Sequence, residues 1–587
     1  MDFSKFELKF PVQRYYMNIP AISPSLSSAG YCNKKGKKME EFKLIIEAIG
    51  GFLWNNYTLY VVVATGIVFT IWSGFSQYYA LTHGFKVIKG DYDKDDDPGA
   101  ISHFQALSTA LSATVGLGNI GGVALAISLG GPGAVFWMWV VGFLGMAIKL
   151  SEVSLSMIHR NTDEADNPSG GPMWVVERNF SDKKGFMKII GKLLAGTFCF
   201  ALIINTITAG NMFQAWNVAN LTEAYFGVPT LVTGTILALI VGSVIIGGIK
   251  RIGSVTSKLV PIMLIIYVLA CIYVLAINFT AIPEMLRLIV SAAFSPMESS
   301  NAFLGGTAGA AFIFGMQRAL FSNEAGQGSS AIAHSAAKTD EPVREGVVAG
   351  LEPFIDTIVV CTMSALVILV TGIWNRPAEV QLSNLAVNQS GQNWSIDGAV
   401  GDAPTLGSGD KVFMIYSGSK NKESGNALHK VYGTVIVNDA QKSIEWDKIA
   451  SDKEPETNGE VYLDYVGANL TAAAFDKVSN GLGKWLVTLA SWLFAISTMI
   501  SWSYYGEKGV SFLLGEKAIL TYKLAFCVLA VISTTGFIQT DRELNLFANL
   551  GTGLCIMANL PILWLFGYQA IRDYKEYISK LKAGEFG

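Results

Sequence analysis

The sequence predicts an all-α integral membrane protein of about 11 transmembrane helices, interrupted by one small, β-leaning insertion. The first observation behind this prediction is composition, because 51% of the 587 residues are hydrophobic and only 15% are charged. Soluble domains carry about 25% charged residues, and the mean hydropathy here is +0.40. The second observation is a series of apolar stretches of about 20 residues, the length that a helix needs to cross a bilayer. Together they exclude a soluble enzyme, a disordered chain and a disulfide scaffold.

Eleven stretches qualify as spans, since a helix satisfies its backbone amides without water. In chain order they are Tyr57–Tyr79, Phe104–Leu129, Ala134–Leu155, Leu193–Leu221, Pro229–Ile249, Leu259–Ile282, Phe303–Met316, Gly346–Ile373, Trp485–Tyr505, Ala518–Ile538 and Leu544–Ala570. The amino terminus is polar and the first apolar stretch is long enough to span, so we expect no cleaved signal.

Lysine and arginine are concentrated in alternate loops, and short loops rich in these residues stay in the cytoplasm. They lie between spans three and four, five and six, seven and eight, and nine and ten, and after the last span. This alternation places the carboxyl terminus in the cytoplasm and the amino terminus outside. The basic cluster Lys34–Lys38 disagrees. We therefore interpret residues 1–38 as an upstream extension and expect translation to begin at Met39; a tolerated basic tail is the alternative.

The chain divides into five parts by composition. Residues 1–50 form an amino-terminal extension, and residues 51–375 form a membrane domain with the extra first helix. Residues 376–480 form an acidic insertion, which the orientation above places outside the cytoplasm. Apolar and polar residues alternate in it along Lys411–Ser417 and His429–Asn438, as in strands. It is either a partner-binding module or an insertion without a function of its own. Residues 481–571 complete the membrane domain, and residues 572–587 form a cytoplasmic tail.

Several functions are excluded by what the sequence lacks. A net charge of −3 gives no sign of nucleic-acid binding. The five histidines are scattered, and no metal-type or catalytic spacing appears, so we do not expect an enzyme. A phosphate-cradling loop for ATP is also missing. An ion channel, which would show a repeated filter and symmetric subunits, is the alternative from another functional class.

Two glycine-rich segments occupy matching places in the chain. Without the first span, the other ten divide five and five, and each five opens with a glycine-broken member. The first break is expected in Ala113–Gly122, and the second in Gly305–Gly315 followed by Phe321–Gly328. Interrupted helices in corresponding positions indicate a transporter binding site, because freed amides bind a carboxylate and freed carbonyls bind a hard cation. Close packing of helices through small residues is the alternative.

Polar residues in three other spans are candidates for the same site. Gln214 belongs to a stripe of amides and hydroxyls on the fourth span. Asp356 lies deep in the eighth span, where a charge costs at least about 2.5–3.5 kcal/mol, so it is a candidate cation ligand. Glu352 is interpreted as an end-of-helix residue.

The ninth span supplies neighbouring hydroxyls. Ser497 and Thr498 complete an oxygen cage for sodium with carbonyls around Ser112 and Val115, since hard cations prefer oxygen ligands. Trp502 lies four residues after Thr498, on the same helix face. It either caps a small ligand or anchors the helix at the membrane interface.

At these residues the sequence resembles the alanine/glycine:cation symporter family, also called sodium:alanine symporters. The strongest match is Gly-Gly-Pro-Gly-Ala-Val-Phe-Trp-Met-Trp-Val at 130–140. Thr114–Gly122, Phe321–Gly328 and Trp502–Glu507 support it, and the resemblance covers roughly residues 45–375 and 466–570. It implies a leucine-transporter-type fold with a five-plus-five inverted repeat after one extra helix. It also implies a multi-pass protein of the prokaryotic plasma membrane.

The resemblance implies sodium-coupled import of alanine or glycine by alternating access. Sodium is the coupling ion, and no organic cofactor is expected. The expected surroundings are membrane lipid, with no obligatory protein partner. By similarity, the amino acid is contacted by Thr114, Gly118, Gln214, Asn323 and Trp502, and a sodium ion is held by Val115, Ser497 and Thr498. Asn119 and Asp356, with Thr114, form a second cation position. A proton-coupled transporter, in which Asp356 titrates, is the alternative.

Overall fold

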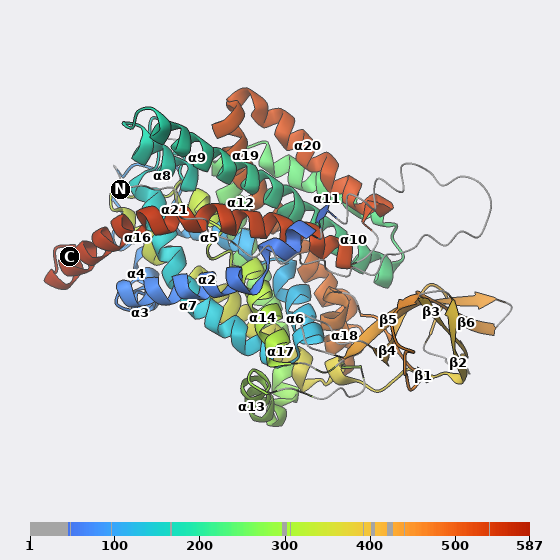
Figure 1. The fold of residues 1–587 in the computed structure, drawn as a ribbon. Helices are drawn as coiled ribbons and strands as arrows, with labels where there is room; N and C mark the ends of the chain where they lie inside the picture. The colour runs from blue at the N-terminus through green and yellow to red at the C-terminus, as the bar shows by residue number, and fades with distance from the viewer. Residues whose placement is uncertain are drawn as a thin grey trace, which may run out of the picture.

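The protein is described by a computed structural model that covers residues 45–46, 48–94, 97–164, 167–295, 297, 302–303, 305, 307–390, 393–400, 406–418, 427–438, 441–465, 467–538 and 541–586. The predicted start at Met39 and the basic cluster before it lie outside these residues. Most of the described chain is helical (Figure 1).

The first half of the chain contains helices on both sides of two π-helical turns. The α-helices are α2 (Asn56–Trp72), α3 (Gln77–Thr82), α4 (Gly84–Ile88), α5 (His103–Thr114), α6 (Val123–Gly130), α7 (Gly133–Ile158), α8 (Pro172–Phe180), α9 (Phe186–Ile207), α10 (Phe213–Phe226), α11 (Thr230–Ile245), α12 (Gly248–Ile277) and α13 (Ile282–Ala292). The π-helical turns are Gly118–Gly122 and Thr208–Met212, and Phe279–Ala281 is a short 3₁₀-helix.

The second half continues in the same manner around the β-strands. Its α-helices are α14 (Ala308–Asn323), α15 (Ser330–His334), α16 (Pro342–Ala349), α17 (Thr362–Val370), α18 (Ala468–Val478), α19 (Thr488–Leu514), α20 (Ile519–Ile532) and α21 (Asp541–Ala583). The π-helical turns are Phe354–Cys361, Gly483–Val487 and Ser533–Phe537, and the 3₁₀-helices are Ile373–Asn375 and Glu516–Ala518.

Eight continuous helical segments in the described chain are long and apolar enough to cross a membrane, or nine if one bent pair is a single span. All eleven predicted stretches overlap helices, although α11 and α14 have only 16 residues each. Leu239, Ile265 and Leu524 are more than half exposed. Large apolar side chains exposed in such number along long helices are expected on a lipid-facing surface. The chain is therefore an integral membrane protein, and its exact number of crossings stays a prediction.

The first predicted break is present. Helix α5 ends at Thr114, Val115 has non-helical torsion angles (φ −78°, ψ 87°), and the chain resumes as the π-helical turn Gly118–Gly122. The two halves meet at an angle of 50°. The break lies within the glycine-rich segment Ala113–Gly122, as expected.

The second break lies later than part of the prediction placed it. Helix α14 runs without interruption through Gly309 and Gly315 to Asn323, and the chain leaves the helix at Glu324 (φ +57°). A side chain at Gly315 would collide with the backbone carbonyl of Ala134 in α7. This glycine therefore permits close packing of two helices, and among the described residues of the two segments the interruption lies in Phe321–Gly328.

The predicted insertion contains two antiparallel sheets. The strands are β1 (Val380–Gln381), β2 (Ser383–Ser390), β3 (Asn393–Ala399), β4 (Lys411–Ser417), β5 (Leu428–Asn438), β6 (Gln441–Trp446), β7 (Ile449–Ala450) and β8 (Glu460–Leu463). The strand orders are β1-β8-β4-β5-β6 and β2-β3-β7, and in the larger sheet Phe413 pairs with Tyr432. The strands share their own small apolar core, separate from that of the helices.

Helix α18 follows the strands but packs with the membrane helices. Thr471 donates a hydrogen bond from Oγ1 to the carbonyl of Ile120 (3.0 Å), and Phe475 is fully buried. The strands lie at one end of the molecule, and the C-terminal end of α21 extends from the opposite side (Figure 1). The end of the predicted insertion therefore contacts the first broken helix directly.

Candidate substrate and ion site

A small internal cavity lies where the two breaks meet. Four predicted residues line it: Thr114, Gly118, Gln214 and Trp502. They come from both sides of the first break, from α10 and from α19. The other lining residues are Ala113, Gly116, Ala209, Phe321, Gln327 and Thr552. The volume of about 10 Å³ is near the minimum for one water molecule. Binding of a molecule as small as an amino acid therefore requires the lining side chains to move.

Gln214 joins the first break to a second irregular helix. Its Oε1 accepts a hydrogen bond from the backbone N–H of Leu117 (3.2 Å), and its Nε2 donates to the carbonyl of Ala209 (3.1 Å). Leu117 is in the interrupted part of the first broken helix, so its N–H lacks a regular helical partner. A side chain at Gly116 would come within 3.3 Å of the same Oε1. Gln214 is thus positioned by the break itself.

Trp502 covers the cavity from α19. Its ring lies against Gly210 so closely that any side chain there would overlap it, and Tyr505 supports it in an edge-to-face contact at 5.3 Å. Gly210 lies in the π-helical turn Thr208–Met212, which carries the backbone toward α19. The capping role is therefore consistent with the position of Trp502, which is 4% exposed.

Asn323 is the one predicted substrate contact that does not line this cavity. Its Nδ2 donates to Thr357 Oγ1 (3.0 Å), and its Oδ1 accepts from the backbone N–H of Ala325 (2.9 Å). Its amide therefore stabilises the end of α14. Phe321 and Gln327 line the cavity from this part of the chain instead.

Neither Phe321 nor Gln327 was predicted as a site residue, although both belong to the glycine-rich segment Phe321–Gly328. Gln327 accepts from Asn205 Nδ2 (2.8 Å) and donates to the carbonyl of Leu320 (2.8 Å). Its position in the turn after α14 could have identified it as a site residue, because an interrupted helix exposes side chains and backbone together. Phe321 faces the first break, since a side chain at Gly118 would meet its ring at 3.1 Å.

The predicted sodium ligands lie together at the end of α5. Thr498 Oγ1 is 3.0 Å from the carbonyl oxygen of Ser112, and Ser497 Oγ is 3.5 Å from the same oxygen. Val115 is fully buried and ends the helix. The last carbonyls of a helix carry partial negative charge. Two hydroxyls and a helix carbonyl therefore converge with the oxygen chemistry that a hard cation prefers.

The second predicted cation position is a hydrogen-bonded hub around Asp356. Its Oδ1 accepts from Asn119 Nδ2 (2.5 Å), and its Oδ2 accepts from Ser322 Oγ (2.8 Å) and Thr357 Oγ1 (2.7 Å). Asn119 belongs to the first broken helix and Ser322 to the second. The carboxylate is fully buried, and these donors compensate its charge. The structure thus brings Asn119 and Asp356 together, while Thr114 lines the cavity.

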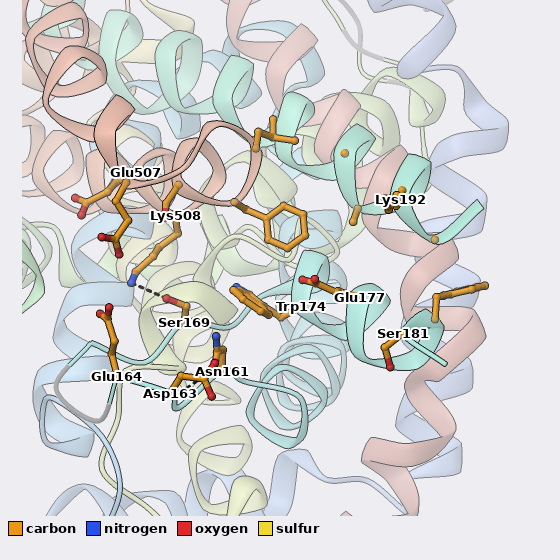
Figure 2. Close-up of a pocket in the computed structure, with 18 of the residues that line it drawn as sticks. Asn161, Asp163, Glu164, Ser169, Trp174, Glu177, Ser181, Lys192, Glu507 and Lys508 are labelled. Carbon is orange, nitrogen blue, oxygen red and sulfur yellow. Dashed lines mark hydrogen bonds between the residues drawn. The ribbon is translucent and has the colours of Figure 1, made fainter. Parts of the chain in front are cut away.

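A larger cavity of about 910 Å³ opens among α8, α9 and the C-terminal end of α19 (Figure 2). Lys508 crosses one wall, where its Nζ donates to Asn167 Oδ1 and Ser169 Oγ, both at 2.8 Å. Lys508 follows Trp502 by six residues, roughly 9 Å along a helix. No predicted site residue lines this cavity. It is therefore distinct from the candidate site.

Comparison with known proteins places the chain among transporters. The profile of the sodium:alanine symporter family matches residues 39–401 and 456–586. The gap in this match, residues 402–455, contains β4 to β7. The sodium/alanine symporter AgcS of Methanococcus maripaludis is 34% identical over 84% of this chain and 89% of its own length. The putative sodium/proton-dependent alanine carrier protein YrbD (28%; 92% of this chain, 93% of its own) and the amino-acid carrier protein AlsT (27%; 92% and 94%), both of Bacillus subtilis, are also similar.

Proposed function

The chain belongs to the sodium:alanine symporter family, and we propose that it imports small neutral amino acids, alanine or glycine, together with sodium. The observation that carries this proposal is the meeting of two interrupted helices at one buried cavity. Backbone groups released at such breaks bind the carboxylate and the cation of a substrate–ion pair. Family membership makes the chain a transporter of this class, and the geometry supports the assignment of individual residues.

The lining favours a small substrate. Trp502 and Phe321 are large aromatic side chains in a cavity that is almost filled in this conformation. Gln214 offers an amide, and Thr114 a hydroxyl, for the polar groups of an amino acid. A bulky substrate side chain would have to displace both rings, so alanine and glycine fit the proposal better than larger amino acids.

Sodium is the proposed coupling ion, bound by Ser497 and Thr498 with carbonyls at the end of α5, including that of Val115. Joint binding of ion and substrate at one break makes the affinity of each depend on the other. Coupling by a proton at Asp356 is the alternative. The three donors around Asp356 offset part of the cost of burying its charge, so the separate sodium and proton gradients in the uptake assay decide between the two coupling ions.

The proposed topology follows from the basic loops. It places the C-terminal end of α21 in the cytoplasm and the amino terminus and the strands outside. The position of the strands at the opposite end from the terminus of α21 supports this proposal. The five-plus-five repeat and the membrane crossings at α11 and α14 belong to the same proposal.

Purified protein in liposomes provides the direct test. Labelled alanine and glycine uptake is measured with sodium, potassium or proton gradients imposed separately. We expect uptake only with the sodium gradient, since each sodium ion gains about 2.3 kcal/mol per 100 mV of membrane potential. Uptake driven by the proton gradient alone would favour the alternative.

Gln214→Ala should weaken uptake more than it weakens folding. The substitution leaves the Leu117 N–H without its acceptor, at a cost of about 1–3 kcal/mol, or roughly 10- to 100-fold in apparent affinity for alanine. The matched control is Asn220→Ala on the same helix, because Asn220 only donates to the carbonyl of Trp216 (2.8 Å). Wild-type uptake by the Gln214 variant would remove this residue from the site.

Gly210→Ala should impair uptake by displacing Trp502. The added methyl group would overlap the indole ring, and overpacking of this kind costs about 1–3 kcal/mol. Gly196→Ala on α9 is the control, because nothing lies within 4 Å of the added atom there. Uptake kinetics of both variants check the prediction, and equal KM values for alanine in the two would contradict it.

A further inference from the structure

A cluster of five charged or titratable side chains is buried away from the candidate site. His334 Nδ1 lies 2.5 Å from Glu345 Oε1, and His334 Nε2 lies 2.7 Å from Glu352 Oε1. His103 Nδ1 contacts the other oxygen of Glu345. Lys149 Nζ lies 3.2 Å from Glu352 Oε2. All five residues are at most 2% exposed.

The three histidine–carboxylate contacts need more hydrogens than two neutral histidines and two ionised carboxylates can supply. An ionised carboxylate only accepts hydrogen bonds, and a neutral imidazole carries one N–H. At separations of 2.5–2.7 Å two lone pairs cannot face each other, so each contact contains a hydrogen. Two neutral histidines provide two hydrogens for three contacts. The cluster therefore holds one additional proton, shared within the group rather than owned by one residue.

Charge balance leads to the same count. Glu345 and Glu352 carry two negative charges, and Lys149 with the additional proton carries two positive ones. Without that proton the cluster keeps a net negative charge in a buried, membrane-embedded place, which is costly. Other titratable side chains also face the cluster. They are Glu152 from α7, Arg160 just after α7, Glu324 from the turn before α15, Arg344 from α16 and Tyr505 from α19. The two acids, Glu152 and Glu324, and the two guanidinium groups, Arg160 and Arg344, are opposite in sign and equal in number, so they leave this balance unchanged.

The cluster connects the two broken helices to each other. His103 begins α5, the first half of the first broken helix, and His334 ends α15, the segment after the second break. Glu345 comes from α16, Glu352 from the continuation of the same helical segment, and Lys149 from α7. Asp93, which is partly exposed, lies 3.6 Å from His103 Nε2. The Asp93 side chain is 45% exposed, so His103 is on the side of the cluster nearest to solvent.

We propose that His103, Glu345, His334 and Glu352, with Lys149, form a buried proton-binding site that holds the two broken helices together. The ligand is a single proton, bound at a place separate from the proposed sodium and substrate positions. Loss of the proton leaves one imidazole lone pair facing a carboxylate oxygen and a net negative charge in the cluster, and it loosens the contact on which the closed arrangement of both breaks depends. The site makes stability and transport sensitive to alkaline pH.

Glu345→Gln is the decisive variant. The glutamine oxygen accepts from His103, its amide donates to His334 Nδ1, and His334 Nε2–H donates to Glu352, so both histidines stay neutral and no extra proton is needed. Glu352→Gln removes the requirement in the same way from the other side. His334→Gln does not, because its single amide oxygen must face a carboxylate. His83→Gln is the matched control, since His83 is buried and hydrogen-bonds to the hydroxyl of Tyr577 (2.7 Å) rather than to a carboxylate.

The experiment measures thermal unfolding of the purified full chain without substrate, and alanine uptake in liposomes, across about pH 6 to 10. For the parent and His83→Gln we expect both to decline at alkaline pH, with uptake falling about tenfold per pH unit beyond the midpoint. Glu345→Gln and Glu352→Gln should lose this decline, and His334→Gln should melt lower throughout. A parent protein whose melting temperature is flat over this range would overturn the proposal, as would an unchanged alkaline decline in both glutamine variants. The melting measurement stands even if alanine is not the substrate.

Discussion

Asp356→Ala should lower the melting temperature of the purified protein and abolish amino-acid uptake. The substitution removes the acceptor shared by Asn119, Ser322 and Thr357. A buried donor left without an acceptor costs about 1–3 kcal/mol, so we expect the free energy of unfolding to fall by about 3 kcal/mol or more and the melting temperature by a few degrees. Because Asn119 and Ser322 belong to different broken helices, the loss also weakens the connection between the two halves of the site, which keep only the direct Asn119–Ser322 hydrogen bond (3.1 Å).

Two companion variants make the result for Asp356 interpretable. Asp356→Asn keeps an acceptor oxygen, so it should melt between the parent and the alanine variant. Cys361→Ala changes a buried neighbour whose Sγ makes only weak contacts, at 3.4 Å, with Asn119 and Ser322, and it should behave like the parent. Unfolding and uptake by Asp356→Ala that match those of Cys361→Ala would refute the role of the hub.

The first broken helix was predictable because glycines and polar residues are concentrated at one place in an apolar span. The break at Val115 follows from the run Gly116–Gly122, where backbone freedom and polar neighbours coincide. The second break shows the limit of this signal. Gly315 is also a glycine in a glycine-rich apolar segment, yet the helix continues through it and it permits close approach to Ala134. Glycine permits both outcomes, and only the facing helix, which the sequence does not specify locally, decides between them.

The site could be predicted where a residue's role depends on its own helix. Thr498 and Trp502 share one face of α19 and Ser497 is next to Thr498, so their spacing was enough to place them near each other. Asn323 and Gln327 are only four residues apart, but Asn323 ends α14 and Gln327 lies in the turn after it, so helical periodicity does not relate their directions. Asn323 therefore lies against Thr357, and Gln327 lines the cavity.

The buried ionic cluster could not be predicted from the sequence. Glu352 was interpreted as an end-of-helix residue, and the structure contradicts this, because it is fully buried inside the segment Pro342–Val370. His103 and His334 are 231 residues apart, and they share Glu345 only in the folded chain. Local spacing carries no information about such contacts, whereas an acid in an apolar span signals that some partner exists.

Thr498→Val should reduce the apparent affinity for sodium more than the maximal uptake rate. Valine has nearly the shape of threonine but lacks the hydroxyl that lies 3.0 Å from the carbonyl of Ser112. Hydrogen-bond or ligand contacts to a charged partner contribute about 1.5–3 kcal/mol, so we expect a roughly 10- to 100-fold higher sodium concentration for half-maximal uptake. The dependence of alanine uptake on sodium concentration measures this shift.

The controls for Thr498 separate ion binding from packing. Thr498→Ser retains the hydroxyl and should keep most of the sodium affinity despite the lost methyl group. Ser491→Ala removes a hydroxyl from the same helix, where Ser491 Oγ has no hydrogen-bond partner among the described residues, and should leave the sodium dependence unchanged. Because the sodium ligands and Gln214 meet at the same break, Thr498→Val should also weaken alanine binding at low sodium and restore it at saturating sodium. A variant that lowers uptake equally at every sodium concentration would show that Thr498 supports the helix rather than the ion.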